Sequence, residues 1–188
     1  LGGLTKDQTR ALAEENGFIN ARKRDSQDIC FVPDGDYAAF IRRWTGQEFP
    51  PGEFVGTHGE VYGPHKGIIH YTVGQRKGLG LSFPQPMFVK EIDTEKNQVV
   101  LAKAEELFSQ EVTARDINLI SVGSIPQPME VKARVRYRQK EQPATVVQTG
   151  PDELKVVFHQ PQRAITPGQA LVLYQGDTVV GGGKIVGN

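Results

Sequence analysis

The first segment with a clear pattern of polar and apolar positions is a short helix near the N-terminus. Thr5 can accept a hydrogen bond from the backbone of Gln8, whose side chain can return it, and helix-forming residues follow as far as Gly17. The next residues offer no partner for the apolar side of this helix. We therefore expect it to be the last element of a domain whose body lies upstream.

A second helix is predicted from Asp36 to Gly46. Its apolar side chains, spaced by three and four positions so that they share one face, are Tyr37, Phe40, Ile41 and Trp44. Between the two helices, residues 21–28 are mostly charged and residues 29–32 are mostly apolar. That change predicts a connector that leads into a short strand.

The rest of the chain has the short apolar runs and frequent glycines of β-structure. Residues 53–102 are predicted to form short strands interrupted by glycines, and a polar stretch follows. From residue 131 the candidate strands recur about every ten residues, as in a compact barrel or sandwich. They are 131–138, 144–148, 154–158, 170–174 and 179–186.

Two turns between these strands agree with that interpretation. Thr166-Pro167-Gly168-Gln169 has proline and glycine at the central positions of a type II turn, and Gln175-Gly176-Asp177-Thr178 suits a hairpin. The predicted fold class is mainly β with short helices: a small β-rich central domain followed by a C-terminal β-barrel.

The composition narrows the partners that are expected. The 22 basic and 22 acidic side chains cancel, so any contact with nucleic acid must come from local patches. No apolar run approaches the roughly 20 residues that cross a bilayer, so we expect a cytoplasmic protein with no membrane partner. The single cysteine excludes an intrachain disulfide.

Cys30 is the first candidate for chemistry. Basic residues at 22–24 would stabilise a thiolate, whereas Asp25 and Asp28, and burial beside apolar neighbours, would disfavour it. The sequence leaves the direction of the pKa shift open. An inert cysteine buried in a strand is the alternative.

Residues 131–140 form the second candidate. Five cations alternate there with apolar or neutral residues, and in one strand they would line one face at intervals of about 6.6 Å. They are Lys132, Arg134, Arg136, Arg138 and Lys140. The pattern indicates a phosphate-binding face, or else the solvated exterior of a barrel.

A glycine-rich segment at residues 63–80 is the third candidate. Gln75, Arg76 and Lys77 offer donors within it, although an ordinary hairpin explains the glycines as well. The segment lacks the ending of a phosphate-binding Walker loop. Four histidines and one cysteine without paired spacing predict no metal site.

Four motifs, in order along the chain, resemble those of the bacterial tRNA-specific 2-thiouridylases. Two are Lys-Arg-Asp-Ser-Gln-Asp-Ile-Cys-Phe at 23–31 and His-Tyr-Thr-Val-Gly-Gln-Arg-Lys-Gly-Leu-Gly at 70–80. The others are Arg-Tyr-Arg-Gln at 136–139 and Ala-Ile-Thr-Pro-Gly-Gln at 164–169. Together the four motifs extend over most of the chain.

The resemblance implies an activity and a role for each motif. In that family ATP activates the wobble uridine (position 34) of tRNA by adenylation, and a relay protein delivers sulfur as a persulfide on a cysteine. The match implies that Cys30 carries the persulfide. A partner cysteine then attacks the persulfide, forming a disulfide bond, or releases sulfide from it. Arg136, Tyr137 and Gln169 are expected to contact tRNA, whose anticodon arm is the expected partner. Gln75, Arg76 and Lys77 are not included in this set.

The resemblance also implies a division of the chain. Residues 1–26 match the end of an N-terminal ATP-binding domain and a connector, 27–104 the central domain with the persulfide cysteine, and 105–188 the tRNA-contacting barrel. The family's ATP loop, its other catalytic cysteine and its catalytic aspartate do not occur in this sequence, so we expect no thiolation by this chain alone. Two alternatives are an RNA-binding barrel with an inert Cys30 and a redox protein with a peroxide-sensitive Cys30.

Overall fold

The computed structural model describes residues 1–23, 29, 31–32 and 34–187. Within these residues the fold is mainly β, with two α-helices, a small sheet and a closed barrel, which confirms the predicted fold class. The chain divides into two compact units, Leu1–Gln47 and Glu48–Asn188. The predicted domain boundaries after residues 26 and 104 stay predictions.

Helix α1 (Lys6–Glu15) begins as its sequence predicts. The Gln8 backbone N–H donates to Thr5 Oγ1 (3.3 Å), and the Thr5 N–H donates to Gln8 Oε1 (2.8 Å). This reciprocal pair satisfies two donors that the first helical turn leaves free. Gly17 follows with a φ of +71°, a backbone conformation that glycine adopts without a steric cost. No residue of α1 is buried.

Helix α2 (Tyr37–Thr45) is capped by Asp36, whose carboxylate accepts from the Ala39 N–H (2.9 Å). The Phe40 ring lies 5.1 Å from that of Phe31 and 6.0 Å from that of Trp44, so the predicted apolar face is present. The short strand predicted just before this helix is absent from the described residues there. Among the described residues there, the Val32 N–H donates to the Ile29 carbonyl (2.9 Å). The apolar run is very short, and an isolated strand without a pairing partner is unstable.

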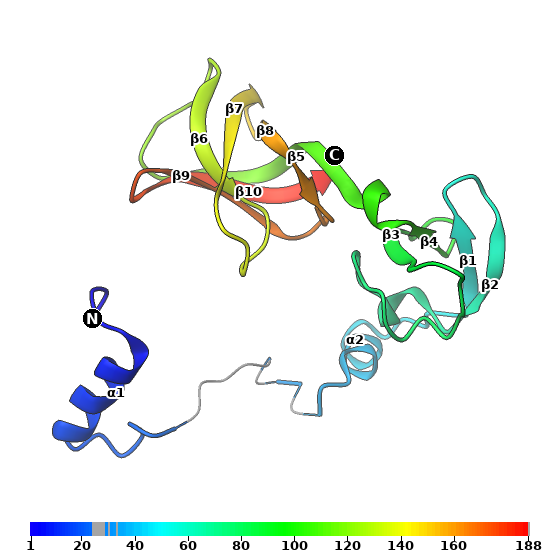
Figure 1. Ribbon diagram of the computed structural model, residues 1–188, viewed down its shortest axis with the longest axis horizontal. Helices are drawn as coiled ribbons and strands as arrows, with labels where there is room; N and C mark the ends of the chain where they lie inside the picture. Colours follow the sequence, from blue (N-terminus) through cyan, green and yellow to red (C-terminus); the bar gives the residue numbers. More distant parts are fainter. Residues whose placement is uncertain (24–28, 30, 33, 188) are drawn as a thin grey trace. The chain divides into compact units, whose positions relative to one another are not determined.

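The second unit begins with a four-stranded sheet in the order β2-β1-β4-β3 (Figure 1). Its strands are β1 (Gly52–Gly56), β2 (Val61–His65), β3 (Phe88–Asp93) and β4 (Gln98–Ala102). Strand β1 pairs in parallel with β4, and short 3-10 helices lie at Ile68–His70 and Ala104–Leu107. Phe54, Val89, Val99 and Leu101 form the centre of its apolar core.

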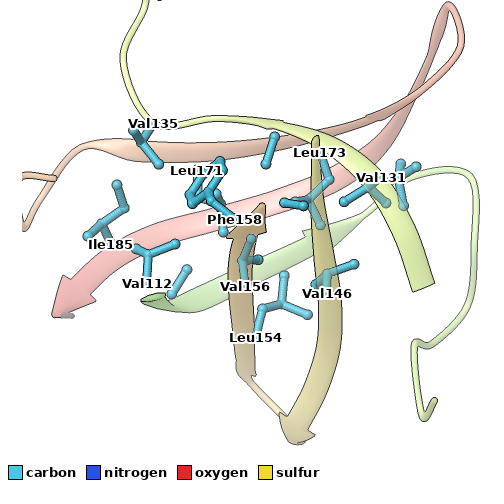
Figure 2. Close-up of a cluster of buried hydrophobic side chains, with 14 of the residues drawn as sticks. Val112, Val131, Val135, Val146, Leu154, Val156, Phe158, Leu171, Leu173 and Ile185 are labelled. Atoms are coloured by element: carbon cyan, nitrogen blue, oxygen red, sulfur yellow. The ribbon is translucent and has the colours of Figure 1, made fainter. Parts of the chain in front are cut away.

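Six strands then close into a barrel in the order β10-β5-β8-β7-β6-β9. They are β5 (Phe108–Leu119), β6 (Met129–Arg134), β7 (Gln142–Gly150), β8 (Glu153–Arg163), β9 (Ala170–Gln175) and β10 (Thr178–Gly187). Alternate side chains of all six strands fill the interior, with Phe158 among Leu171, Val156 and Ile185 (Figure 2). The core therefore depends on period-two alternation, which the sequence displays in most of these strands.

Strand β5 was not predicted from the sequence, although with 12 residues it is the longest strand among the described residues. Only Val112 and Ala114 of this strand are fully buried. A register shift against β8 near Ser109 and a positive φ at Asp116 (+51°) interrupt its regular pleat. The apolar alternation that reveals other strands is therefore too short here.

The strand predicted at 131–138 ends early, at Arg134. Val131, Ala133 and Val135 are buried as the alternation predicts, but residues 135–139 leave the ladder and form a turn. The partner strand β7 begins at Gln142, opposite Ala133, so residues beyond Arg134 have no strand to pair with on that side. The five cations therefore do not share one strand face.

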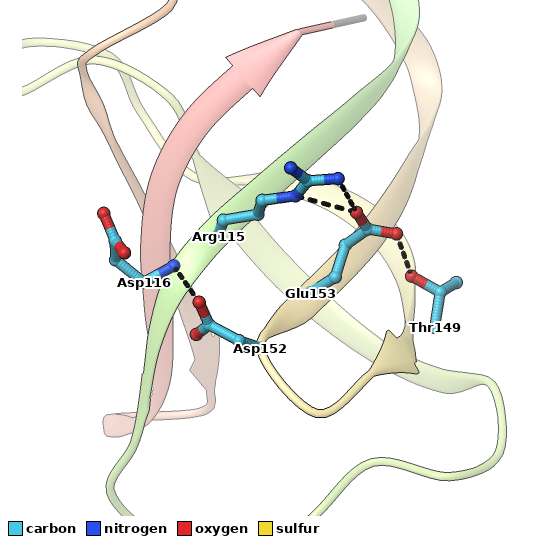
Figure 3. A network of polar contacts seen from close by, with 5 residues as sticks. All are labelled: Arg115, Asp116, Thr149, Asp152 and Glu153. Carbon is cyan, nitrogen blue, oxygen red and sulfur yellow. Dashed lines mark hydrogen bonds and ion pairs between the residues drawn. The ribbon is translucent and has the colours of Figure 1, made fainter.

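A polar network joins the β7–β8 turn to strand β5 (Figure 3). The Glu153 carboxylate accepts from Arg115 Nε (3.0 Å) and Nη2 (2.9 Å) and from Thr149 Oγ1 (2.7 Å). Beside it the Asp152 carboxylate accepts from the backbone N–H groups of Asp116 (3.1 Å) and Ile117 (2.8 Å). The Thr149 hydroxyl, followed by Arg115, lowers the pKa of Glu153.

Two glycines in β10 differ in how closely neighbouring strands approach them. A Cβ on Gly182 would lie 3.2 Å from Val172 Cα and still closer to the Leu171 carbonyl oxygen, whereas a Cβ on Gly187, in the same strand, would meet nothing within 4 Å. We expect Gly182→Ala to lower the free energy of unfolding by roughly 1–3 kcal/mol. Gly187→Ala should change it by less than about 0.5 kcal/mol. Urea unfolding of both variants measures this, and equal losses would contradict the packing described here.

Glu153 predicts a pH dependence of stability. Its pKa is lower in the folded chain than in the unfolded chain, so it contributes stability above the usual carboxyl pKa, and this contribution is lost as the pH falls through the folded value. In urea unfolding across the acid range, Glu153→Gln should therefore flatten the decline of stability. Asp177→Asn is the control, because Asp177 is exposed and its carboxylate makes no hydrogen bond to any residue that the structure describes. A steep decline that survives in Glu153→Gln would exclude this carboxylate as its source.

Candidate nucleic-acid interface

The turn at residues 135–139 is held by the guanidinium of Arg136. Its Nη2 donates to the carbonyls of Ala164 (2.7 Å) and Val73 (3.2 Å) and to Thr166 Oγ1 (3.0 Å), and its Nε donates to the Ala164 carbonyl (3.2 Å). Val73 belongs to the segment between β2 and β3, whereas Ala164 and Thr166 follow barrel strand β8. Arg136 thus bridges the part of the chain that carries the small sheet and the barrel.

Burial changes the acidity of this guanidinium. Desolvation, and then the charge of Arg163, lower the pKa of Arg136, since both disfavour the charged form. The Arg163 guanidinium itself lies over the Phe88 ring, 4.8 Å from the ring centroid. The two arginines therefore stand together where the small sheet meets the barrel.

Gln139 anchors the other end of the turn. Its Nε2 donates to Oε1 of the buried Gln162 (2.6 Å), and its backbone N–H donates to the Arg136 carbonyl (3.1 Å). Tyr137 lies between the two anchors, and its side chain is 91% exposed. An exposed aromatic ring on a turn fixed from both ends is available for a partner at a small cost in entropy.

Gln169 is positioned by the turn that the sequence predicts. Gly168 has a φ of +87°, the Gln169 N–H donates to the Thr166 carbonyl (3.3 Å), and the Gln169 carbonyl accepts from the Ile185 N–H (2.8 Å). The backbone is therefore fixed by the barrel. Its side-chain amide makes no hydrogen bond to any residue that the structure describes.

The three residues predicted to contact tRNA lie at one pocket of about 570 Å³ on the barrel. Arg136, Tyr137 and Gln169 line it together with Arg134, Val172 and Tyr174. The first two come from the turn after β6, and the third comes from the turn before β9. The pairing of β6 with β9 brings these distant segments together.

Tyr174 was missed by the sequence analysis as a site residue. Arg134 lies over its ring, 5.5 Å from the ring centroid, and pairs with Glu141 (Nη2 to Oε1, 2.9 Å). The signal was present in β9, where Leu171 and Leu173 are buried and residues 170, 172 and 174 therefore face outward. Outward alternation identifies Tyr174, but only the β6–β9 pairing assigns it to this pocket.

The predicted phosphate-binding face of five cations is wrong as a single surface. Lys132 is exposed on β6, but Arg134 is paired with Glu141 and Arg136 is turned into the bridge. Arg138 and Lys140 lie beyond the end of the strand. The reason is the end of the ladder at Arg134, which a strict alternation does not reveal.

The remaining candidates have separate outcomes. Cys30 lies outside the described residues, so its predicted role stays a prediction. Gln75 stabilises its own loop, accepting from the Thr72 N–H (3.0 Å) and donating to the Lys77 carbonyl (2.9 Å). Arg76 and Lys77 are exposed.

A larger cavity of about 840 Å³ lies beside the acceptors of the Arg136 hydrogen bonds. Val73, Ala164 and Thr166, which are the bridge acceptors, line it together with Tyr71, Leu107 and Ile165. Within the described residues no three histidine, cysteine, aspartate or glutamate side chains are grouped as metal ligands would be. No helix among those described has the length and apolar character to span a membrane.

Family models match three consecutive parts of the chain. A tRNA methyl transferase HUP domain model matches residues 1–34, a tRNA methyl transferase PRC-barrel domain model matches 38–103, and an aminomethyltransferase β-barrel domain model matches 109–185. The last two ranges contain the small sheet and most of the closed barrel.

Curated relatives named tRNA-specific 2-thiouridylase MnmA match almost the entire sequence. That of Acetivibrio thermocellus is 52% identical over 98% of this chain, and those of Carboxydothermus hydrogenoformans and Clostridioides difficile are 49% and 47% identical over the same share. The chain belongs to the tRNA-specific 2-thiouridylase family. It spans about half the length of these thiouridylases, 52% of the first and 51% of the other two.

The Arg136 bridge of this thiouridylase-family chain predicts a stability effect. Arg136→Ala would remove the donor from the Val73 and Ala164 carbonyls and from Thr166 Oγ1, and Ala164 already has a φ of +53°. We expect the free energy of unfolding to fall by roughly 1–3 kcal/mol. Arg136→Lys should lower the free energy of unfolding as well, because an ammonium lacks the planar fork of a guanidinium and cannot reach the same acceptors.

Lys132→Ala is the matched control for this prediction, since Lys132 is an exposed cation on the adjoining strand. Its expected effect on thermal or urea unfolding is below about 0.5 kcal/mol. If Arg136→Ala were as mild as Lys132→Ala, the bridge would contribute little to stability.

Proposed function

We propose that this chain is the sulfur-carrying and tRNA-binding part of a tRNA 2-thiouridylase. The enzyme would replace the C2 oxygen of the wobble uridine (position 34) with sulfur, using ATP and a cysteine persulfide. The relatives named tRNA-specific 2-thiouridylase MnmA, at 47–52% identity over 98% of the chain, support this proposal. The chemistry belongs to a longer protein, of which the chain supplies Cys30 and the barrel.

The observation that carries the tRNA-binding role is the convergence at the barrel pocket. Tyr137 offers an exposed ring, Gln169 offers a side-chain amide, and Arg136 lines the same pocket. RNA-binding proteins recognise loops by stacking on aromatic rings and by hydrogen bonds to base edges. Arg136 would serve the tRNA by fixing the turn as well as by contact, since four hydrogen bonds already engage it.

Cys30 would carry the sulfur. Its persulfide sulfur attacks C2 of the uridine, forming a carbon–sulfur bond as the activated oxygen departs with AMP. Attack by the thiolate of a partner cysteine on the Cys30 sulfur then breaks the sulfur–sulfur bond. The electron pair of that bond forms the thiocarbonyl, and the two cysteines become a disulfide, which a reductant must reopen. Alternatively, the partner thiolate first attacks the Cys30 sulfur of the persulfide, which forms the disulfide and releases sulfide. The sulfide then attacks C2 and displaces the activated oxygen with AMP.

Further parts of the proposal rest on the family resemblance. They are an N-terminal domain that binds ATP and holds the partner cysteine, a relay protein that donates sulfur, the anticodon arm of tRNA as the bound element, and a cytoplasmic location. A polypeptide of this sequence alone should bind tRNA without thiolating it.

Replacing Cys30 in the longer enzyme tests the sulfur-carrying role. We expect Cys30→Ser to reduce 2-thiouridine formation to background, because a hydroxyl cannot carry a persulfide. Product is measured by mass spectrometry of digested tRNA after incubation with ATP and a persulfide donor. Binding of tRNA by the same variant is the control and should be unchanged.

The outcomes separate the competing functions. Loss of product with normal binding supports the sulfur carrier. Undiminished product would refute it and leave the chain as an RNA-binding barrel with an inert cysteine. Sensitivity of Cys30 to peroxide without any affinity for tRNA would instead favour a thiol redox protein.

A further inference from the structure

The pocket beside Tyr137 has walls suited to a flat, partly polar ligand. Tyr174 presents its ring under the Arg134 guanidinium, Val172 supplies apolar surface, and the amide of Gln169 stands at the opposite turn. A nucleobase has the matching features, namely two faces that stack and an edge that forms hydrogen bonds. The volume of about 570 Å³ is within the range of small-ligand sites.

We propose that this pocket binds one unstacked nucleobase of an RNA loop, with Tyr174 and Arg134 as the stacking platform. Tyr137 then borders the bound base, and Gln169 reads its edge. The inference rests on the proposed tRNA-binding function and adds to it the kind of contact, the two platform residues and a preference for unpaired RNA.

The charges at the pocket favour a base over a phosphate. The Arg134 guanidinium is paired with Glu141 at 2.9 Å, so its charge is largely neutralised and an acidic group lies close by. Most of the hydrogen-bonding capacity of Arg136 is directed away from the pocket, at the Val73 and Ala164 carbonyls and Thr166. The guanidinium face over the Tyr174 ring extends a stacking surface, which suits a base more than a phosphate.

The pocket is also fixed before any ligand arrives. Arg136 and Gln139 hold the turn that carries Tyr137, and the Ile185 N–H holds the Gln169 carbonyl. Tyr174 lies within strand β9, which pairs on both sides, with β6 and β10. Preorganisation of this kind lowers the entropic cost of binding. A base inside a duplex cannot use it, because its faces are covered by neighbouring pairs.

The test uses the 188-residue chain and three RNA probes. These are a stem-loop with the sequence of a tRNA anticodon arm, a blunt duplex of the same stem, and a series of stem-loops with one abasic loop position each. We expect the stem-loop to bind more tightly than the duplex. One abasic position should weaken binding by about tenfold to a hundredfold, the range for a stacked base.

Two variants assign that position to the pocket. Tyr174→Leu keeps apolar volume but removes the aromatic face, and Tyr137→Ala alters an exposed ring that supports no core. Tyr174→Leu should bind the intact stem-loop and the stem-loop with the sensitive abasic position with equal affinity, because the two changes remove the same contact. The salt dependence should stay unchanged, since no charge is lost. Tyr62→Leu is the matched control, a half-buried tyrosine beside Phe83 and outside this pocket.

Each outcome decides a different claim. If the chain binds the stem-loop but Tyr174→Leu and Tyr137→Ala behave like Tyr62→Leu, or if duplex and loop bind equally, the base pocket is refuted and tRNA binding stands. If the chain binds no RNA, the proposed tRNA-binding role and the base pocket both fail. A loss confined to Tyr137→Ala, with Tyr174→Leu folded and unaffected, would exclude the Tyr174 platform.

Discussion

The Arg136 guanidinium is the contact on which the arrangement of the second unit depends. Its four hydrogen bonds end on acceptors from the segment before β3 and from the loop after β8. The same residue begins the turn that presents Tyr137, and it lines the pocket on the barrel. A charged donor shared among partly buried carbonyls is costly to remove, because each acceptor would then lose its partner. The stability of the unit and the geometry of the candidate site are therefore coupled through one residue.

Closure of the barrel explains why the candidate site is formed by turns and outward side chains. Six strands without a free edge leave no strand edge open for pairing, so the proposed RNA partner would contact turns and outward side chains. The turns after β6 and before β9 meet because β6 pairs with β9. A rigid interior filled by residues such as Phe158 and Leu171 holds these turns in place. The barrel thus fixes the pocket, and the turns contribute the side chains of Arg136, Tyr137 and Gln169 to its lining.

The electrostatics of the chain fit recognition by shape and stacking more than by bulk charge. Basic and acidic side chains are equal in number, and two of the cations near the pocket, Arg134 and Arg136, are engaged internally. Long-range attraction to a polyanion is weak under these conditions, so affinity must come from short-range contacts. Lys132, exposed on β6, remains available for a phosphate outside the pocket. If the pocket binds a base as proposed, the barrel would discriminate an RNA loop from a duplex.

The sequence by itself determined the features that depend on neighbouring residues. The Thr5 and Asp36 caps, the turn at Gly168, the alternation in β9 and the mainly β class follow from interactions over a few positions. The family motifs named Arg136, Tyr137 and Gln169 but gave no geometry. Only the tertiary structure revealed β5, the end of β6 at Arg134, the inward role of Arg136 and the place of Tyr174. Each of these depends on which distant strand lies alongside, and pairing between distant segments leaves no periodic signal in a single sequence.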